Sequence, residues 1–80
     1  MLTIFDKKEP TLGRAQKLVG GYVECLTVGG GDRLIFNEEG KIHNLPINKE
    51  ATKLFTDEFG KVDVICGDAI LIKKAIRKNW

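Results

Sequence analysis

The stretch YVECLTVGGGDRLIF, from Tyr22 to Phe36, decides the fold of this chain. Its two ends are rich in β-branched and aromatic side chains, which favour strands. Between them, three consecutive glycines and an aspartate supply the backbone freedom that a tight chain reversal needs. Triple glycines also occur in phosphate-binding loops, but those loops lead into a helix with a Lys-Ser/Thr pair, whereas here a second strand follows. The stretch therefore predicts a β-hairpin.

Upstream of the hairpin, the sequence predicts a short strand and a helix. Residues 2–5 are mostly apolar and read as a strand. Thr11 can cap a helix whose apolar residues recur every three or four positions, and Gly20 and Gly21 can end it. One face of this helix should therefore pack against the sheet.

Downstream of the hairpin, a second helix is expected at residues 49–59. Asn48 is its predicted N-cap, and Gly60 its predicted end. Helical spacing places four apolar side chains on its inner face: Ala51, Leu54, Phe55 and Phe59.

The other connections predict further short strands. Residues 37–40 should form a turn in which Gly40 takes a positive φ, and residues 41–43 should return as a brief strand. Between residues 61 and 72, one strand bent or bulged at Gly67 is favoured over two reversing strands. The predicted fold class is α+β: a small, mostly antiparallel, curved sheet of four or five strands, with one face packed by two short helices.

The length bounds the architecture. Eighty residues form a single domain, residues 1–80, with a basic tail at residues 73–80. A core of this size rarely supplies more than about 3–5 kcal/mol of stability, so self-association would be a natural supplement. No apolar stretch approaches the roughly 18 residues of a membrane span, and no secretory signal is visible, so the expected location is the cytoplasm.

The charge is uneven. The net charge is +2, but the tail holds four of the thirteen basic residues and no acid. A basic segment that ends in an aromatic residue can hold single-stranded nucleic acid through phosphate contacts and stacking. The candidate residues for this are Lys73, Lys74, Arg77, Lys78 and Trp80. A solvated or packed tail is the favoured alternative.

The residue inventory argues against an enzyme. The chain has no serine and one histidine, His43, so a serine nucleophile is excluded. Cys25 and Cys66 lie in apolar runs that raise the pKa of a thiol, and we expect both to be reduced core thiols. These few ligands predict neither a metal site nor a cofactor.

Four polar residues near predicted strand ends and connectors are candidates for a ligand groove: Tyr22, Glu24, Asn44 and Asn48. Most also have an ordinary structural explanation. Asn48 is the predicted helix cap, and Tyr22 can cover the sheet with its hydroxyl in water.

Four runs of the chain resemble a family of small phage- and bacterium-encoded domains known only as a domain of unknown function. The runs are LVGGYVE at residues 18–24, FNEEGK at 36–41, LPINKEAT at 45–52 and ICGDAIL at 65–71. The resemblance spans residues 18–71. It implies a viral or mobile-element origin, and it supplies no activity, substrate or catalytic residue.

These observations favour a non-enzymatic, phage-encoded protein-interaction module that binds a host or viral protein. Strand addition is the expected mode, with a homo-oligomer covering an exposed sheet edge. One alternative is an oligomer that sequesters a small ligand or nucleotide. The other is a nucleic-acid accessory protein that uses the basic tail. If the chain is phage-encoded, the host cytoplasm is its expected location.

Overall fold

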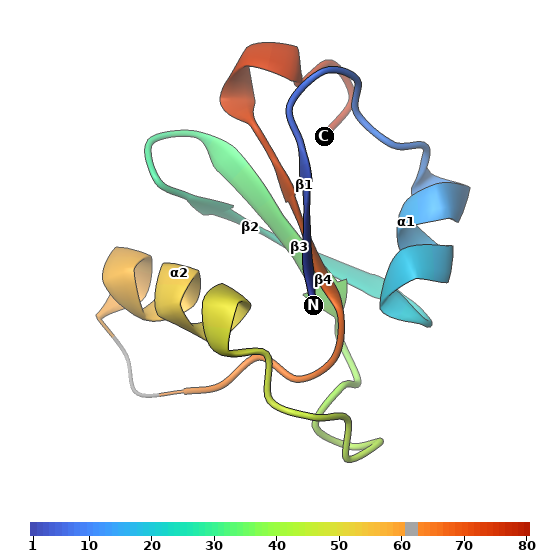
Figure 1. Ribbon diagram of the computed structural model, residues 1–80, viewed down its shortest axis with the longest axis vertical. Coiled ribbons are helices and arrows are strands. Elements are labelled where there is room, and N and C mark those ends of the chain that lie inside the picture. The colour runs from blue at the N-terminus through green and yellow to red at the C-terminus, as the bar shows by residue number, and fades with distance from the viewer. Residues whose placement is uncertain (61–62) are drawn as a thin grey trace.

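The computed structural model describes residues 1–60 and 63–80 and shows a mixed four-stranded sheet with two α-helices (Figure 1). The elements follow the order β1 (Leu2–Phe5), α1 (Leu12–Val19), β2 (Val23–Val28), β3 (Asp32–Asn37), α2 (Lys49–Phe59), β4 (Ala69–Ile72) and a 3₁₀ helix, η1 (Lys74–Ile76). The α+β class and the β2–β3 hairpin are therefore confirmed.

The strand order in the sheet is β1-β4-β3-β2. The β2–β3 and β3–β4 pairs are antiparallel, whereas β1 and β4 run parallel. A parallel pair needs a long crossover, and here the whole chain between β1 and β4 provides it. The last strand is thus inserted beside the first, in the middle of the sheet.

The two helices lie on opposite faces of the sheet (Figure 1), so the prediction that both cover one face is wrong. Alternate residues of the central strands point to each side. Ile35 and Ile70 pack with α1, whereas Leu34 and Leu71 belong to the core beneath α2. Strand β4 is buried along its entire length, and its uninterrupted apolar sequence is the pattern of a strand covered on both faces.

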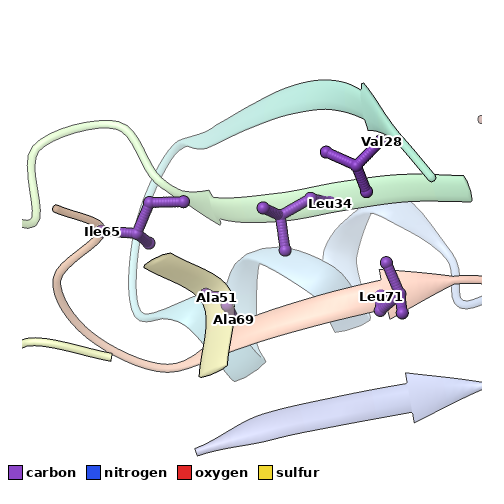
Figure 2. Close-up of a cluster of buried hydrophobic side chains, with 6 residues drawn as sticks. All are labelled: Val28, Leu34, Ala51, Ile65, Ala69 and Leu71. Carbon is purple, nitrogen blue, oxygen red and sulfur yellow. The ribbon is translucent and has the colours of Figure 1, made fainter. Parts of the chain in front are cut away.

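Figure 2 shows the core on the α2 side, where Ala51 of the helix lies above Ala69 of β4. Ile65 closes one end of this cluster and Val28 lies toward the other end. Phe59, predicted to face inward, is instead 41% exposed. It lies in the last turn of α2, outside the cluster of buried residues.

Both helices begin and end where the sequence predicts. The Thr11 hydroxyl accepts a hydrogen bond from the Arg14 N–H at 3.1 Å, and the side-chain carbonyl oxygen of Asn48 accepts one from the Ala51 N–H at 3.0 Å. Gly20 and Gly60 end the helices in the left-handed conformation that glycine adopts without strain.

The connection after β3 differs from the prediction. Residues 41–44 form turns rather than a strand, and Asn44, not Gly40, takes the positive φ of this loop, at 54°. Gly40 is required for a different reason, because a side chain there would overlap the Cys66 carbonyl oxygen. The loop therefore packs closely against the segment that leads into β4.

The predicted bent strand at Gly67 is also not formed. Residues 61 and 62 lie outside the described residues, and within the described part the last strand begins only at Ala69. Cys66 instead makes an isolated antiparallel bridge with Ile47. Gly67 has a φ of 94°, and its N–H donates to the Pro46 carbonyl, which fixes the approach to β4.

Candidate functional site

Strand β2 forms one edge of the sheet, with β3 on its inner side. The Glu38 N–H donates to the Tyr22 carbonyl at 3.0 Å, so Tyr22 and Glu38 form a hydrogen-bonded pair of the two strands. Because hydrogen-bonded and non-bonded pairs alternate between antiparallel strands, the even-numbered residues of β2 bond to β3. The odd-numbered residues direct their N–H and C=O groups outward, and among the described residues no further strand meets them: Val23, Cys25 and Thr27. We call this row of outward groups the β2 edge.

The β2 edge lacks the protection common at exposed strands. Its six residues contain no lysine, no proline and one charged side chain, Glu24. Natural sheets often block such edges with lysines, prolines or bulges, because an open edge can pair with another chain. The β2 edge is therefore competent for strand pairing.

Cys25 lies on the α1 side of this edge, opposite Ile35, and it is exposed. The prediction that Cys25 is a core thiol is thus wrong, because its strand lies at the edge of the sheet. Cys66 is buried, as predicted. Desolvation of the sulfur raises the pKa of the Cys25 thiol, and the positive charges of Arg33 and Arg77 only partly oppose this. At neutral pH the side chain is therefore a thiol rather than a reactive thiolate.

A cavity of about 480 Å³ opens on the α2 side of the β2 edge. Glu24 and Leu26 of β2 contribute to it, and we call it the β2 cavity. Its apolar walls also include Phe36, Phe55, Phe59, Ile42 and Val64, of which Ile42 is 74% exposed. Acidic side chains lie at the same cavity: Glu24, Glu38 and Asp63, the last paired with Lys41. The β2 cavity thus combines an apolar interior with a negative rim.

The four predicted ligand residues do not gather at one described cavity. Glu24 lines the β2 cavity, whereas Asn48 lines a separate one of about 690 Å³. Tyr22 is 69% exposed and Asn44 lies on an exposed turn, and neither lines these two cavities. Three further residues of the β2 cavity were not predicted as site residues from the sequence: Ile42, Phe59 and Val64. The feature that marks them as site residues is that they are large apolar residues that the fold leaves exposed.

Asn48 has a structural role that goes beyond its predicted cap. Its side chain is buried, and its amide nitrogen donates to the Met1 carbonyl at 3.0 Å and to the Gly67 carbonyl at 2.9 Å. The same side chain caps α2 through Ala51. One residue therefore joins the start of the chain, the start of α2 and the turn before β4.

The basic tail is packed against the fold. Lys73 Nζ lies 2.9 Å from Asp32 Oδ2, and Arg77 donates to the Gly31 carbonyl. Desolvation raises the pKa of Asp32, but hydrogen bonds from the Lys73 ammonium and the Lys74 N–H outweigh it and leave the pKa below its usual range. Two of the predicted nucleic-acid residues, Lys73 and Arg77, thus have side chains tied to the β2–β3 turn.

Trp80 and Lys78 are also held by the fold. The Trp80 indole N–H donates to the Pro10 carbonyl at 2.7 Å, and its ring packs against the α1-side core. The Lys78 backbone N–H donates to Glu9, while its side chain is exposed.

The groups that could carry catalysis are dispersed. His43 Nε2 lies 3.9 Å from Glu39 Oε1 on an exposed turn, and within the described part of the chain neither thiol hydrogen bonds to it. Among residues 1–60 and 63–80, no three His, Cys, Asp or Glu side chains are placed to hold a metal ion. None of the described helices is long and apolar enough to cross a membrane.

Comparison with known proteins assigns the chain to a family. Residues 3–79 match the family described as Domain of unknown function (DUF3846). The match includes the N-terminal residues and nearly all of the basic tail, so it extends beyond the region of the resemblance, residues 18–71. No curated protein and no solved structure matches the chain. The chain therefore belongs to the DUF3846 family, a family of domains of unknown function.

Proposed function

We propose that this domain is a protein-interaction module that binds an extended segment of a partner protein along the β2 edge. The observation that carries the proposal is the row of outward backbone groups at Val23, Cys25 and Thr27. An added strand would satisfy these groups with main-chain hydrogen bonds, which supply affinity without regard to sequence. That the chain is phage-encoded, that its partner is a host or viral protein, and that it acts in the cytoplasm stay predictions.

The β2 cavity supports a preference among partner segments. Side chains of an added strand alternate between the two faces of the sheet, so every second one points to the α2 side. There, Leu26 and the exposed ring of Phe59 offer an apolar surface, and the carboxylates of Glu24 and Glu38 offer negative charge. The preferred segment therefore carries a large apolar residue on this face and a lysine or arginine beside it.

A display library of ten-residue peptides, selected on the immobilised domain, tests the proposal. We expect enrichment of extended sequences with apolar residues at alternate positions and an adjacent cation. Cys25→Pro removes one outward N–H but no bond to β3, so it should weaken binding by about tenfold, or about 1.4 kcal/mol. Cys25→Val keeps the N–H and is the matched control, which should bind as the unmodified chain does.

Hydrogen exchange keeps the test decisive if Cys25→Pro folds poorly. In the unmodified domain, the amides of Val23 and Thr27 should exchange rapidly and become protected when a selected peptide is added. Peptides that bind without protecting these amides, or that bind Cys25→Pro as tightly as Cys25→Val, would overturn the proposal. A selection that enriches no peptide would also overturn the proposal.

The geometry of the edge also favours a second copy of the chain as a partner. Antiparallel pairing centred on Cys25 places the two cysteines opposite each other and Glu24 opposite Leu26 of the second copy, so no like charges meet. Opposed residues of such a pair have Cα atoms about 5.5 Å apart, within the range that a disulfide spans.

Mild oxidation tests this self-pairing. At alkaline pH, where the thiolate forms, an oxidant should convert the domain to a covalent dimer through Cys25, and Cys25→Val should abolish the product. Cys66 is buried and serves as the internal control. A domain that scatters light as a monomer at high micromolar concentration and forms no covalent dimer would exclude self-pairing at β2.

A further inference from the structure

A third cavity, of about 440 Å³, lies where the N-terminal and C-terminal parts of the chain meet. Residues 7–11 form one wall, and residues 75–79 form the other. Four basic residues line it, two from each wall: Lys7, Lys8, Arg77 and Lys78. We call this cavity the basic pocket. Only Arg77 and Lys78 were candidates from the sequence, because the fold alone brings residues 7 and 8 beside the tail.

The two walls are joined by hydrogen bonds to Glu9 and Pro10. The Glu9 carboxylate accepts from the backbone N–H groups of Lys78, at 2.6 Å, and Asn79, at 2.9 Å. The Trp80 indole donates to the Pro10 carbonyl at 2.7 Å. These bonds link residues about 70 apart in the sequence, so the pocket is an arrangement of the fold rather than a chance meeting of surface side chains.

The charge in the basic pocket is not neutralised locally. Glu9 is the one acid among the described residues that line it, and the Lys78 N–H lowers the pKa of Glu9 by bonding to its charged form. In the described part of the chain, the ammonium groups of Lys7, Lys8 and Lys78 make no ion pair. Three exposed lysines and one carboxylate therefore line the pocket, and the oxygens of that carboxylate already accept two N–H groups.

Arg77 joins the C-terminal wall of the basic pocket to the β2–β3 turn. One end of its guanidinium donates to the Gly31 carbonyl, but its Nε is buried and has no acceptor among the described residues. Because the guanidinium is bonded at the β2–β3 turn and its Nε has no exposed surface, a ligand in the basic pocket would not reach this side chain. An anionic ligand is therefore indicated by the ammonium groups of Lys7, Lys8 and Lys78, which are unpaired in the described part of the chain.

We infer that the basic pocket binds a phosphorylated small molecule of nucleotide size. Its phosphates would lie among the ammonium groups of Lys7, Lys8 and Lys78, and its uncharged part would pack on Pro10, Ala75 and Ile76. The volume falls within the range of about 300–1,000 Å³ usual for small-molecule sites. The Trp80 ring is partly buried against the core and its N–H is bonded, so it offers less surface for stacked bases than a free ring, which disfavours an extended nucleic-acid strand.

Calorimetric titration with four probes tests this inference: ATP, adenosine, inorganic triphosphate and a ten-nucleotide single-stranded DNA. ATP should bind at least about tenfold more tightly than adenosine, because charge-assisted bonds to phosphate supply the affinity. The double variant Lys7→Ala/Lys8→Ala and the single variant Lys78→Ala should each weaken ATP binding by about tenfold. The amide resonances of Lys78 and Asn79 should shift on titration.

A charge-matched control separates a site from general attraction. Lys17→Ala/Lys49→Ala removes two exposed lysines outside the basic pocket and should change ATP binding by less than about twofold. Equal binding of ATP and adenosine, or equal losses in the control and pocket variants, would overturn the inference. DNA binding that is tighter than ATP binding and falls steeply with salt would replace it with a nucleic-acid site.

Discussion

Replacing Asn48 by alanine should lower the free energy of unfolding by about 2–4 kcal/mol. The substitution removes the cap of α2, which is worth about 1 kcal/mol, and the two side-chain bonds to the carbonyls of Met1 and Gly67, of which the Met1 carbonyl keeps a bond from the Ala69 N–H. Because a domain of this size rarely has more than about 3–5 kcal/mol in total, much of the protein should unfold at room temperature. Urea denaturation followed by circular dichroism measures the loss.

Thr11→Ala is the matched control for Asn48→Ala. Within the described part of the chain, the Thr11 side chain caps α1 through a single bond to the Arg14 N–H, so its loss should cost about 1 kcal/mol. The difference between the two variants measures the bonds that connect α2 to Met1 and Gly67. Equal losses would show that Asn48 acts only as a helix cap.

The local signals in the sequence predicted the local structure well. Thr11, Asn48, Gly20 and Gly60 mark the helix ends because capping depends only on neighbouring residues. The hairpin at residues 22–36 was equally predictable, since its reversal is encoded by adjacent glycines. The helix caps and the glycine turn were thus predictable from a few neighbouring residues, whereas the turn at residues 37–44, in which Gly40 takes no positive φ, was not.

The long-range arrangement was not predictable in the same way. The parallel pairing of β1 with β4 joins Leu2 to Ala69, and no nearby residue specifies it. The uninterrupted apolar run of β4 did carry a signal for a strand buried on both faces, and hence for helices on opposite sides. Which residues of two distant strands pair with each other depends on how the whole core packs.

The same division explains the candidate sites. Glu24 was identified as a site residue, but the β2 cavity also needs Phe59 and Val64, whose exposure follows from how α2 and the segment before β4 pack. The tail was identified as basic, whereas Lys7 and Lys8 lie beside it because the neighbouring Glu9 and Pro10 are bonded to the tail. The sequence indicated the chemical character of each site, whereas the fold determined which residues make up that site.

Gly40→Ala should destabilise the domain by about 2–3 kcal/mol, at the upper part of the range for overpacking. A Cβ at this position would overlap the Cys66 carbonyl oxygen, which is backbone and cannot rotate away. The loop cannot move freely either, because the Gly40 N–H donates to the Asn37 carbonyl and the Leu45 N–H donates to the Gly40 carbonyl. Relief therefore requires the separation of two packed segments.

Gly13→Ala should give the opposite sign, and it completes the test. Gly13 lies in α1 and takes no positive φ, and apart from its chain neighbours and its own helix backbone, the methyl group of an alanine there would meet no described atom within 4 Å. Alanine should therefore stabilise the domain by about 0.4–1 kcal/mol. Urea denaturation of both variants measures the contrast. A positive φ would make any glycine replacement costly, but Gly40 has none. A large loss of stability in Gly40→Ala would therefore come from the close approach to Cys66. A Gly40→Ala variant as stable as the unmodified domain would show instead that the two segments move apart at little cost.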